Sequence, residues 1–400
     1  MHDAQGMLAT FRADPYPFYA MLRQQGPVVH LERLRAWNVV GYAEALEVLR
    51  TPAVFSSDVG RYAGGQGAGA QNILGLDPPR HTQLRELVSR AFTPRRVAAL
   101  EPVIGQLTQE LLDAVGAHGA MDIVDDLAYP LPVSVIALLL GVPPADRARF
   151  KRWSDVIVAH LGGNLVEDAA PAAPALAPAL AEFRAYFEAE IAARRQQPRD
   201  DLVSALVAAE VDGQQLTPEE LLAFCRLLLV AGNETTTNLI GNAVRCLLDY
   251  PDQAERVRQD VSLVPAYIEE VLRFRSPVQG TRRWAVTDTQ LDSQRLAAGQ
   301  LVLVWVAAAN RDPAVFPAPE QFDLAREPNR HLAFGHGPHF CLGAPLARLE
   351  AKVALTAIVQ RLPHLRRADD APLDPVDAPA MHGVKHLRVR FDAAEAGAAR

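Results

Sequence analysis

The fold of this 400-residue chain depends most on one stretch of sequence, Phe334-Gly335-His336-Gly337-Pro338-His339-Phe340-Cys341-Leu342-Gly343. The stretch places a cysteine at the end of a glycine-spaced loop and at the start of a helix predicted over 342–362. Backbone N–H groups and the positive dipole end of a helix stabilise a sulfur anion, and glycines let the main chain approach a flat ligand without Cβ clashes. This pattern is typical of a loop that presents a thiolate to a planar partner.

Two other interpretations of Cys341 remain open at this point. One is a buried structural thiol beside a tight turn. The other is a metal site, because His331, His336, His339 and Cys341 lie within eleven positions of the chain. The single thiol and the flanking glycines favour a planar partner over a tetrahedral cage.

The composition is that of a globular protein, with 49% hydrophobic and 22% charged residues. A chain of this kind can bury a large core, and no Gly/Ser linker or shift in composition divides it. We therefore expect one domain over residues 1–400.

The net charge of −7 argues against a nucleic-acid partner, which needs a basic face to neutralise phosphates. The sequence contains neither a signal-peptide pattern nor a run of about 18 apolar residues. Its three cysteines are too few for a disulfide framework, and Cys225 and Cys246 lie roughly 30 Å apart on one predicted helix. We expect a cytoplasmic protein without a membrane or nucleic-acid partner.

Helical periodicity dominates the chain from His81 onward, which predicts a mainly α fold with a small β region. A Gly-rich stretch over 56–77 is expected to lack regular structure, and the Ala/Pro segment 168–178 is expected to link two helices. The predicted elements are a hairpin at 28–31 and 36–40, helices at 42–50, 81–92, 96–115, 129–140, 144–161, 176–195, 201–210, 218–250 and 262–275, and strands at 282–286, 301–306 and 386–391.

The helix predicted over 218–250 has a well-defined start. Thr217 is its N-cap, Pro218 occupies the first helical position, and Glu220 completes a capping box. The helix spans close to 50 Å at about 1.5 Å per residue, and its middle has hardly any polar face. Such a helix crosses the centre of the molecule.

An acid and an alcohol interrupt that apolar middle, at Glu234 and Thr235. A buried carboxylate beside a hydroxyl suggests proton delivery, since both groups must be satisfied or solvated. Thr235 is expected to bond back to the carbonyl of Ala231, which opens a local groove in the helix. The alternative is a kinked helix without chemistry.

The cysteine stretch resembles the signature of the cytochrome P-450 superfamily, Phe-x-x-Gly-x-x-x-Cys-x-Gly, at Phe334, Gly337, Cys341 and Gly343. The resemblance implies the cytochrome P-450 fold, with the long central helix over heme b and Cys341 as the axial ligand of the heme iron. A cysteine thiolate pushes electron density onto the iron and favours O–O cleavage. Phe334 is then expected to pack beside the sulfur.

Further motifs occur in the order that this family shows. Glu270 and Arg273 are spaced to pair on one helix face, and the resemblance adds Arg326 as a third, structural partner. The residues expected to contact heme, including cations for its two propionates, are His81, Arg85, Ala231, Arg283, Phe334, Gly335, His339, Cys341 and Gly343.

The resemblance implies a monooxygenase that hydroxylates an apolar small molecule, such as a terpenoid, steroid, fatty acid or polyketide. Glu234 and Thr235 are its expected catalytic residues. Dioxygen is the co-substrate, and electrons are expected from a ferredoxin and its ferredoxin reductase, because no flavin domain fits in the chain. The basic residues expected to dock the ferredoxin are Arg90, Arg95, Arg96 and Arg348.

Substrate contacts are expected from the Gly-rich loop after Gly60, the loop at 168–178, the central helix around 228–235, Val278, Gln279, and the turn at Met381 and His382. Two other functions stay open: a peroxide-driven heme-thiolate enzyme and a non-catalytic heme or gas-binding protein. The intact acid–alcohol pair disfavours both, and a zinc-binding scaffold is more remote.

Overall fold

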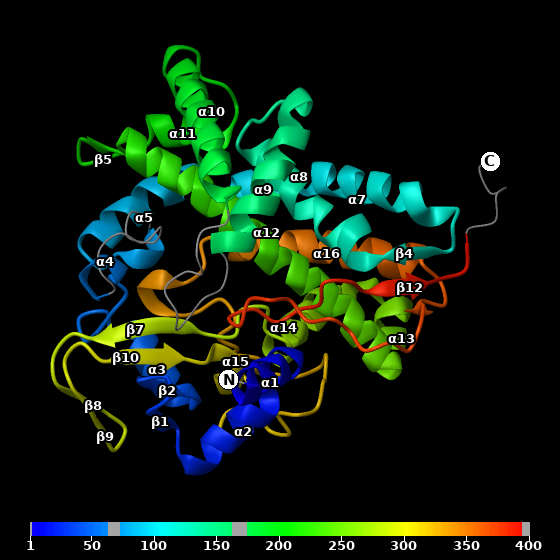
Figure 1. The fold of residues 1–400 in the computed structure, drawn as a ribbon. Coiled ribbons are helices and arrows are strands. Elements are labelled where there is room, and N and C mark those ends of the chain that lie inside the picture. The colour runs from blue at the N-terminus through cyan, green and yellow to red at the C-terminus, as the bar shows by residue number, and fades with distance from the viewer. Residues whose placement is uncertain (1, 63–72, 162–173, 394–400) are drawn as a thin grey trace.

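The computed structural model describes residues 2–62, 73–161 and 174–393 (Figure 1). Positions 63–72 of the predicted Gly-rich stretch and 168–173 of the predicted interhelical loop lie outside the described residues. The expectation that 56–77 lacks regular structure is wrong at both ends of that stretch. A short helix lies at Val59–Tyr62 and a 3₁₀ turn at Ile73–Gly75.

Helices form most of the described chain, so the mainly α prediction is confirmed (Figure 1). They are α1 His2–Ala13, α2 Tyr16–Gln25, α3 Tyr42–Arg50, α4 Val59–Tyr62, α5 Arg80–Ala91, α6 Pro94–Ala98, α7 Glu101–Gly116, α8 Pro130–Leu139, α9 Arg147–Leu161, α10 Leu176–Gln196, α11 Leu202–Ala208, α12 Pro218–Asp249, α13 Pro251–Gln259, α14 Val264–Phe274, α15 Val306–Ala309 and α16 Ala344–Arg361.

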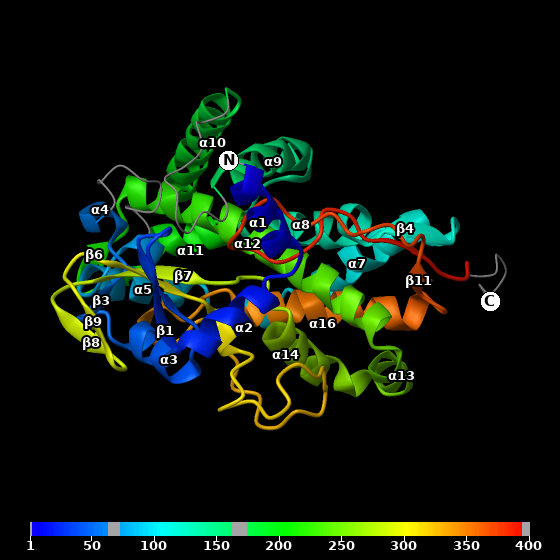
Figure 2. The same cartoon turned by 60° about the horizontal axis from the view of Figure 1, so that its bottom comes forward.

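The β region is small and lies beside the helices (Figures 1 and 2). Its main sheet has the strand order β1 Val28–Leu31, β2 Ala36–Val39, β10 Leu301–Val304, β7 Thr281–Ala285 and β3 Phe55–Ser56. The smaller groups are β4 Ala120–Asp122 with β11 Arg366–Arg367 and β12 Arg388–Arg390, β5 Glu210–Val211 with β6 Gln214–Gln215, and β8 Thr289–Leu291 with β9 Gln294–Leu296.

The main sheet joins strands from the start of the chain to strands from its last third. The predicted hairpin is confirmed as the antiparallel pair β1–β2, and β10 then runs parallel to β2, with Leu301 beside Ala36. The next pair, β10–β7, is antiparallel. Segments from the start and from the last third of the sequence therefore complete one sheet.

Helix α12 is the central element, as the sequence predicted (Figures 1 and 2). Its capping box forms as expected: Glu220 N donates to Thr217 Oγ1 at 3.2 Å, and Thr217 N donates to Glu220 Oε2 at 2.9 Å. The helix packs against α8, α9 and α16. No helix in the described ranges is long and apolar enough to cross a bilayer.

Several predicted boundaries need correction. The helix predicted over 201–210 ends at Ala208, and the strand predicted over 301–306 ends at Val304. The single helix predicted over 96–115 is two helices, α6 and α7, because Pro102 lies at the start of α7. A proline ring clashes with the carbonyl four residues earlier, so a helix cannot continue through it undisturbed. The helix after Cys341 begins at Ala344, two residues later than predicted, with Pro345 in its first turn.

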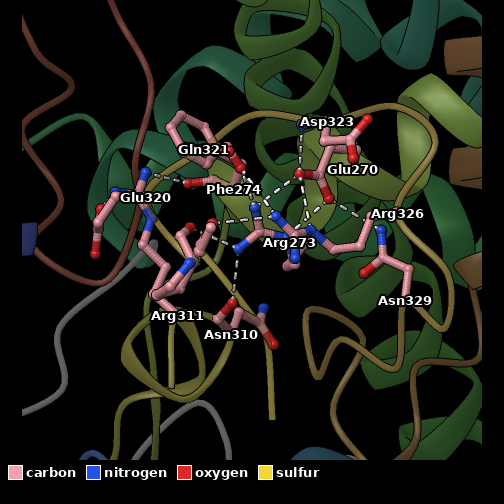
Figure 3. Close-up of polar contacts among 12 residues, drawn as sticks. Glu270, Arg273, Phe274, Asn310, Arg311, Glu320, Gln321, Asp323, Arg326 and Asn329 are labelled. Atoms are coloured by element: carbon pink, nitrogen blue, oxygen red, sulfur yellow. Dashed lines mark hydrogen bonds and ion pairs between the residues drawn. The ribbon is translucent and has the colours of Figure 1, made fainter. Parts of the chain in front are cut away.

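A buried ion cluster fixes α14 to the irregular segment that precedes the cysteine stretch (Figure 3). Glu270 and Arg273 are both fully buried and form two hydrogen bonds, at 2.7 and 2.8 Å. Arg326 adds a third charge, with Nε at 3.3 Å from Glu270 Oε1, so the predicted triad is confirmed. Arg273 also donates to the carbonyls of Asn310, Pro319 and Gln321.

Candidate functional site

A cavity of about 460 Å³ lies between the middle of α12, strand β7 and the cysteine stretch. Most of the residues predicted for the site line it. They are Arg85, Ala231, Glu234, Thr235, Arg283, Phe334, Gly335, His339, Cys341 and Gly343.

The loop before Cys341 is closed by its own backbone. Cys341 N donates to Phe334 O at 2.9 Å, and Gly335 and Gly337 both adopt a φ of +70°. A Cβ atom at Gly337 would lie 2.6 Å from the carbonyl oxygen of Leu49, so this position requires glycine. The loop thereby presents the sulfur of Cys341 to the cavity.

The electrostatics of Cys341 differ from the expectation for a free thiolate. Burial raises the pKa of the Cys341 thiol, and hydrogen bonds from the backbone of Gly343 and Ala344 offset this only in part. The start of the helix therefore does not ionise the sulfur unaided. A thiolate here needs a further positive partner, which a bound metal ion provides.

Helix α12 presents its acid and alcohol to the same cavity. Thr235 Oγ1 donates to the carbonyl oxygen of Ala231 at 2.6 Å, as predicted. Burial raises the pKa of Glu234 to about 7, so its carboxyl group exchanges protons near neutral pH. A Cβ atom at Gly232 would lie 2.8 Å from the side chain of Ile136, so a larger residue here would require Ile136 to shift.

Three of the four predicted cations line the cavity directly, and the fourth lies behind one of them. Burial lowers the pKa of Arg283 to about 10, and its guanidinium donates to Thr281 Oγ1 and to the carbonyl of Arg282. Within the described chain, no carboxylate forms an ion pair with Arg283, Arg85 or His339. A buried guanidinium without an ion-pair partner, as at Arg283, favours an anionic ligand.

His81 is 1% exposed, and its ring centre lies 4.0 Å from that of His339. Neither ring nitrogen of His81 has a hydrogen-bond partner among the described residues, and the same holds for Nε2 of His339. Burial lowers the pKa of both imidazoles, to about 3 for His339. Such stacked, unpaired donors at the end of a cavity suit the carboxylates of a ligand.

The histidines of the alternative metal site do not gather around Cys341. His331 pairs with Glu269 at 3.0 Å, and His336 contacts Arg50. In the described ranges, the possible metal ligands that come together are instead Asp122, Asp125 and His386. The geometry therefore does not support a histidine–cysteine metal cluster.

The sequence did not indicate a role for one buried residue of the site, Glu350, or for Asn233, which is buried behind the cavity. Glu350 lines the cavity from α16, is 1% exposed, and has no partner for Oε2 among the described residues. Asn233 donates to Ser154 Oγ at 2.7 Å and ties α12 to α9. The only local signal for Glu350 was an acid one turn after Leu346 on a largely apolar helix face.

The residues present fit a heme. The cavity offers one cysteine sulfur, a glycine loop for close backbone approach to a flat ring, two arginines without an ion pair in the described chain, and histidine ring nitrogens without hydrogen-bond partners there. An iron ion would supply the positive partner that the sulfur needs.

Comparison with known proteins agrees with this geometry. A family model described as "Cytochrome P450" matches residues 9–385. The chain is 44% identical to the cytochrome P450 monooxygenase PikC of Streptomyces venezuelae over 394 residues, which cover 95% of this chain and 92% of PikC. It is 39% identical to the 6-deoxyerythronolide B hydroxylase of Saccharopolyspora erythraea, over 96% of this chain and 97% of the hydroxylase.

A solved structure shows the same arrangement. The crystal structure of CYP109E1 from Bacillus megaterium in complex with testosterone matches with a TM-score of 0.86 and 41% identity, over 95% of this chain and 99% of the other. Its substrate-free structure gives a TM-score of 0.89. The chain belongs to the cytochrome P450 family and is an oxidoreductase of the monooxygenase type.

Proposed function

We propose that this protein hydroxylates an apolar small molecule with dioxygen and two electrons from a ferredoxin system, using heme b bound through Cys341. One observation carries the proposal: the sulfur of Cys341, the pair Glu234–Thr235 and the guanidinium groups of Arg85 and Arg283 all line one cavity. In this proposal residues 1–400 act as a single domain in the cytoplasm.

Arg85, Arg283 and His339 would hold the two heme propionates, with His81 stacked behind His339. Phe334 packs near the sulfur, and Arg348 lies 4.5 Å from its ring centre. Ala231, Gly335 and Gly343 leave room for the ring of the cofactor. When bound, the heme supplies the activation of dioxygen.

Glu234 and Thr235 deliver protons for the reaction. Glu234 has a pKa near the working pH, so it can release a proton and take up another from water. Thr235 donates a hydrogen bond to the carbonyl of Ala231, which leaves its oxygen free to accept a hydrogen bond from an ordered water. An acid placed in this way argues against a protein that only binds heme or a gas.

The substrate is an apolar molecule of terpenoid, steroid, fatty-acid or polyketide type. Apolar side chains from several elements line the cavity, among them Leu228, Val278 and Met381. The relatives support this class, because one was crystallised with testosterone and another is named for hydroxylating 6-deoxyerythronolide B. Predicted contacts at 63–72 and 168–173 lie outside the described residues.

The electron donor docks on the basic residues near the cysteine side. Arg348 pairs with Glu269, Arg90 with Glu86 and Arg96 with Asp200, whereas Arg95 is exposed and forms no ion pair within the described chain. Arg95 is thus the freest charge for an acidic ferredoxin. Arg95→Glu should slow reduction by ferredoxin and leave substrate binding unchanged, and an unaltered reduction rate would remove this surface from the proposal.

The first test of the function is the absorption spectrum of the purified, dithionite-reduced protein with carbon monoxide, compared with that of Cys341→Ser. A strongly red-shifted Soret band that the variant loses supports a heme-thiolate site. No heme absorption in the wild type overturns the proposal. Turnover with peroxide alone, but not with ferredoxin, would favour the peroxide-driven alternative.

A further inference from the structure

A second cavity, of about 260 Å³, lies further along α12. Arg245 of α12 and Arg367 of β11 line it, together with Ala13 and segments around 373–375 and 383–384. Arg245 is mostly buried, its nearest carboxylate oxygen is that of Asp249 at 3.6 Å, and its Nε has no hydrogen-bond partner among the described residues. This cavity is polar, in contrast to the apolar main cavity.

Three consecutive residues connect the two cavities. Met381 lines the main cavity, Gly383 lines the second, and His382 lies between them at 2% exposure. Burial, with Arg275 nearby, lowers the pKa of His382 to about 3, so its ring is neutral and carries one donor and one acceptor nitrogen. Neither nitrogen has a partner in the part of the chain that the structure describes.

A row of polar side chains on α12 makes the same connection. Glu234, Asn238, Asn242 and Arg245 are spaced by four, four and three residues, which places them on one helix face. The first lines the main cavity and the last lines the second. Asn238 Nδ2 and Asn242 Oδ1, between them, are buried and lack partners among the described residues.

The two segments touch along this row. Asn242 Nδ2 donates to the carbonyl oxygen of His382 at 2.8 Å. A Cβ atom at Gly383 would lie 2.0 Å from Asn238 Oδ1, so glycine is required where the segment passes Asn238. The unpartnered atoms of His382, Asn238 and Asn242 therefore belong to one seam between the cavities.

An unsatisfied buried polar atom costs about 1–3 kcal/mol, and native proteins pair such atoms with ordered water. Side chains four apart on a helix lie about 5–6 Å from each other, a gap that one water molecule bridges. We propose that a line of ordered water molecules runs along this seam and exchanges water between the second cavity and the main cavity.

The positive charge at the second cavity determines which species can enter the line of water molecules. Arg245 and Arg367 line the second cavity, and Arg275 and Arg311 also act on His382. Fixed positive charge repels hydronium and metal cations but admits neutral water. The passage thus lets water leave the main cavity when a ligand enters. This role, though not the passage, rests on the proposed apolar substrate.

Deuterium exchange at Glu234 tests the passage in the heme-loaded protein. After mixing into D₂O, infrared spectroscopy follows the carboxyl band of Glu234, which is identified by its loss in Glu234→Gln. Asn238→Leu and His382→Phe remove polar partners of the water line. Each should slow the exchange roughly tenfold, about the value of one lost hydrogen bond.

Thr237→Val is the matched control, because Thr237 is a buried neighbour of Asn238 whose hydroxyl is already bonded to Asn233 at 3.3 Å. It should leave the exchange rate unchanged. Equal rates in all variants, or equal slowing in all three, would overturn the passage. If Asn238→Leu does not fold, His382→Phe decides the matter.

A high-resolution crystal structure provides a second test. Ordered waters bonded to Asn238 Nδ2 and to the His382 ring support the passage, and a dry seam excludes it. Neither measurement needs turnover, so a failure to oxidise any substrate would count against the proposed function and not against the passage.

Discussion

Two groups of buried charges in this molecule follow opposite rules. Around Glu270, every charge has partners: two arginines reach its carboxylate, and backbone carbonyls take the remaining donors of Arg273 (Figure 3). Around the main cavity, Arg283 is buried and Glu234 is half-buried, and neither forms an ion pair within the described chain.

The difference separates charges that stabilise the fold from charges that take part in binding or catalysis. A fully paired buried cluster fixes one conformation and needs nothing more. Buried groups left unpaired cost stability, and they are retained where a ligand or a proton completes them. Burial alone therefore does not mark a functional residue, and the lack of a partner is the informative feature.

The largest expected effect lies in the paired cluster. Glu270→Gln keeps the shape of the side chain but leaves Arg273 and Arg326 without their carboxylate, so the free energy of unfolding should fall by about 3–5 kcal/mol. Urea denaturation measures the loss. The control is Glu255→Gln, which affects an exposed pair with Arg258 at the same spacing of three and should cost less than about 0.5 kcal/mol. Similar losses in both variants would contradict the comparison.

Glu234 is expected to be needed for turnover, and its replacement should have the second largest effect. Glu234→Gln cannot transfer a proton, so product formation should fall about a hundredfold. The pH profile gives a second readout. If the protonated acid is required, wild-type turnover decreases as the pH rises through about 7, and that decrease disappears in the variant. A variant with the wild-type pH profile would show that Glu234 is not the acid.

Arg283 is expected to hold the cofactor, and its replacement should have a smaller effect than that of Glu234. Arg283→Met should speed the loss of heme to a scavenging globin about tenfold, because a propionate loses its charged partner. The heme-free protein should keep its stability or gain some. Arg194→Met is the contrast, since Arg194 is fully buried and paired with Glu190 and Asp201, and it should destabilise the heme-free protein. The reverse pattern would break the comparison.

The smallest effect concerns stability and pH in the heme-free protein. The pKa of Glu234 is about 7 in the fold against 4.5 in a model carboxyl, so folding favours its protonated form. Relative to Glu234→Gln, the free energy of unfolding of the wild type should be highest below pH 4.5. It should fall by on the order of 1 kcal/mol as the pH rises through 7. Denaturation of both proteins across this range measures the difference, and parallel curves would contradict it.

Local patterns were sufficient to predict much of the fold. The capping box at Thr217 and the β-rich runs around the charged turn of the first hairpin depend on neighbours within a few positions, and both form as predicted. Thr235 follows the same logic, since its hydroxyl bonds one turn back. The break between α6 and α7 was missed, although Pro102 is a local signal for it.

The rest of the site depends on contacts between distant segments. Nothing near His81 indicates that His339 will lie against its ring, and nothing near Asn238 indicates that Gly383 will pass beside it. The effect of burial on the pKa of Cys341 is likewise a property of the packed cavity. Sequence motifs supplied the chemical groups, whereas their pairing or lack of pairing required the three-dimensional structure.

The order of strands in the main sheet also has a consequence for synthesis on the ribosome. The parallel partner of β2 is β10. On the ribosome β2 is therefore synthesised about 265 residues before its partner, and Ala36 has no neighbour on that side until Leu301 has been translated. During that time the hairpin has an open edge, which is a site for aggregation. Nascent chains that stop before β10 lack the strand that closes the sheet, so chaperones should associate with them until translation passes residue 304.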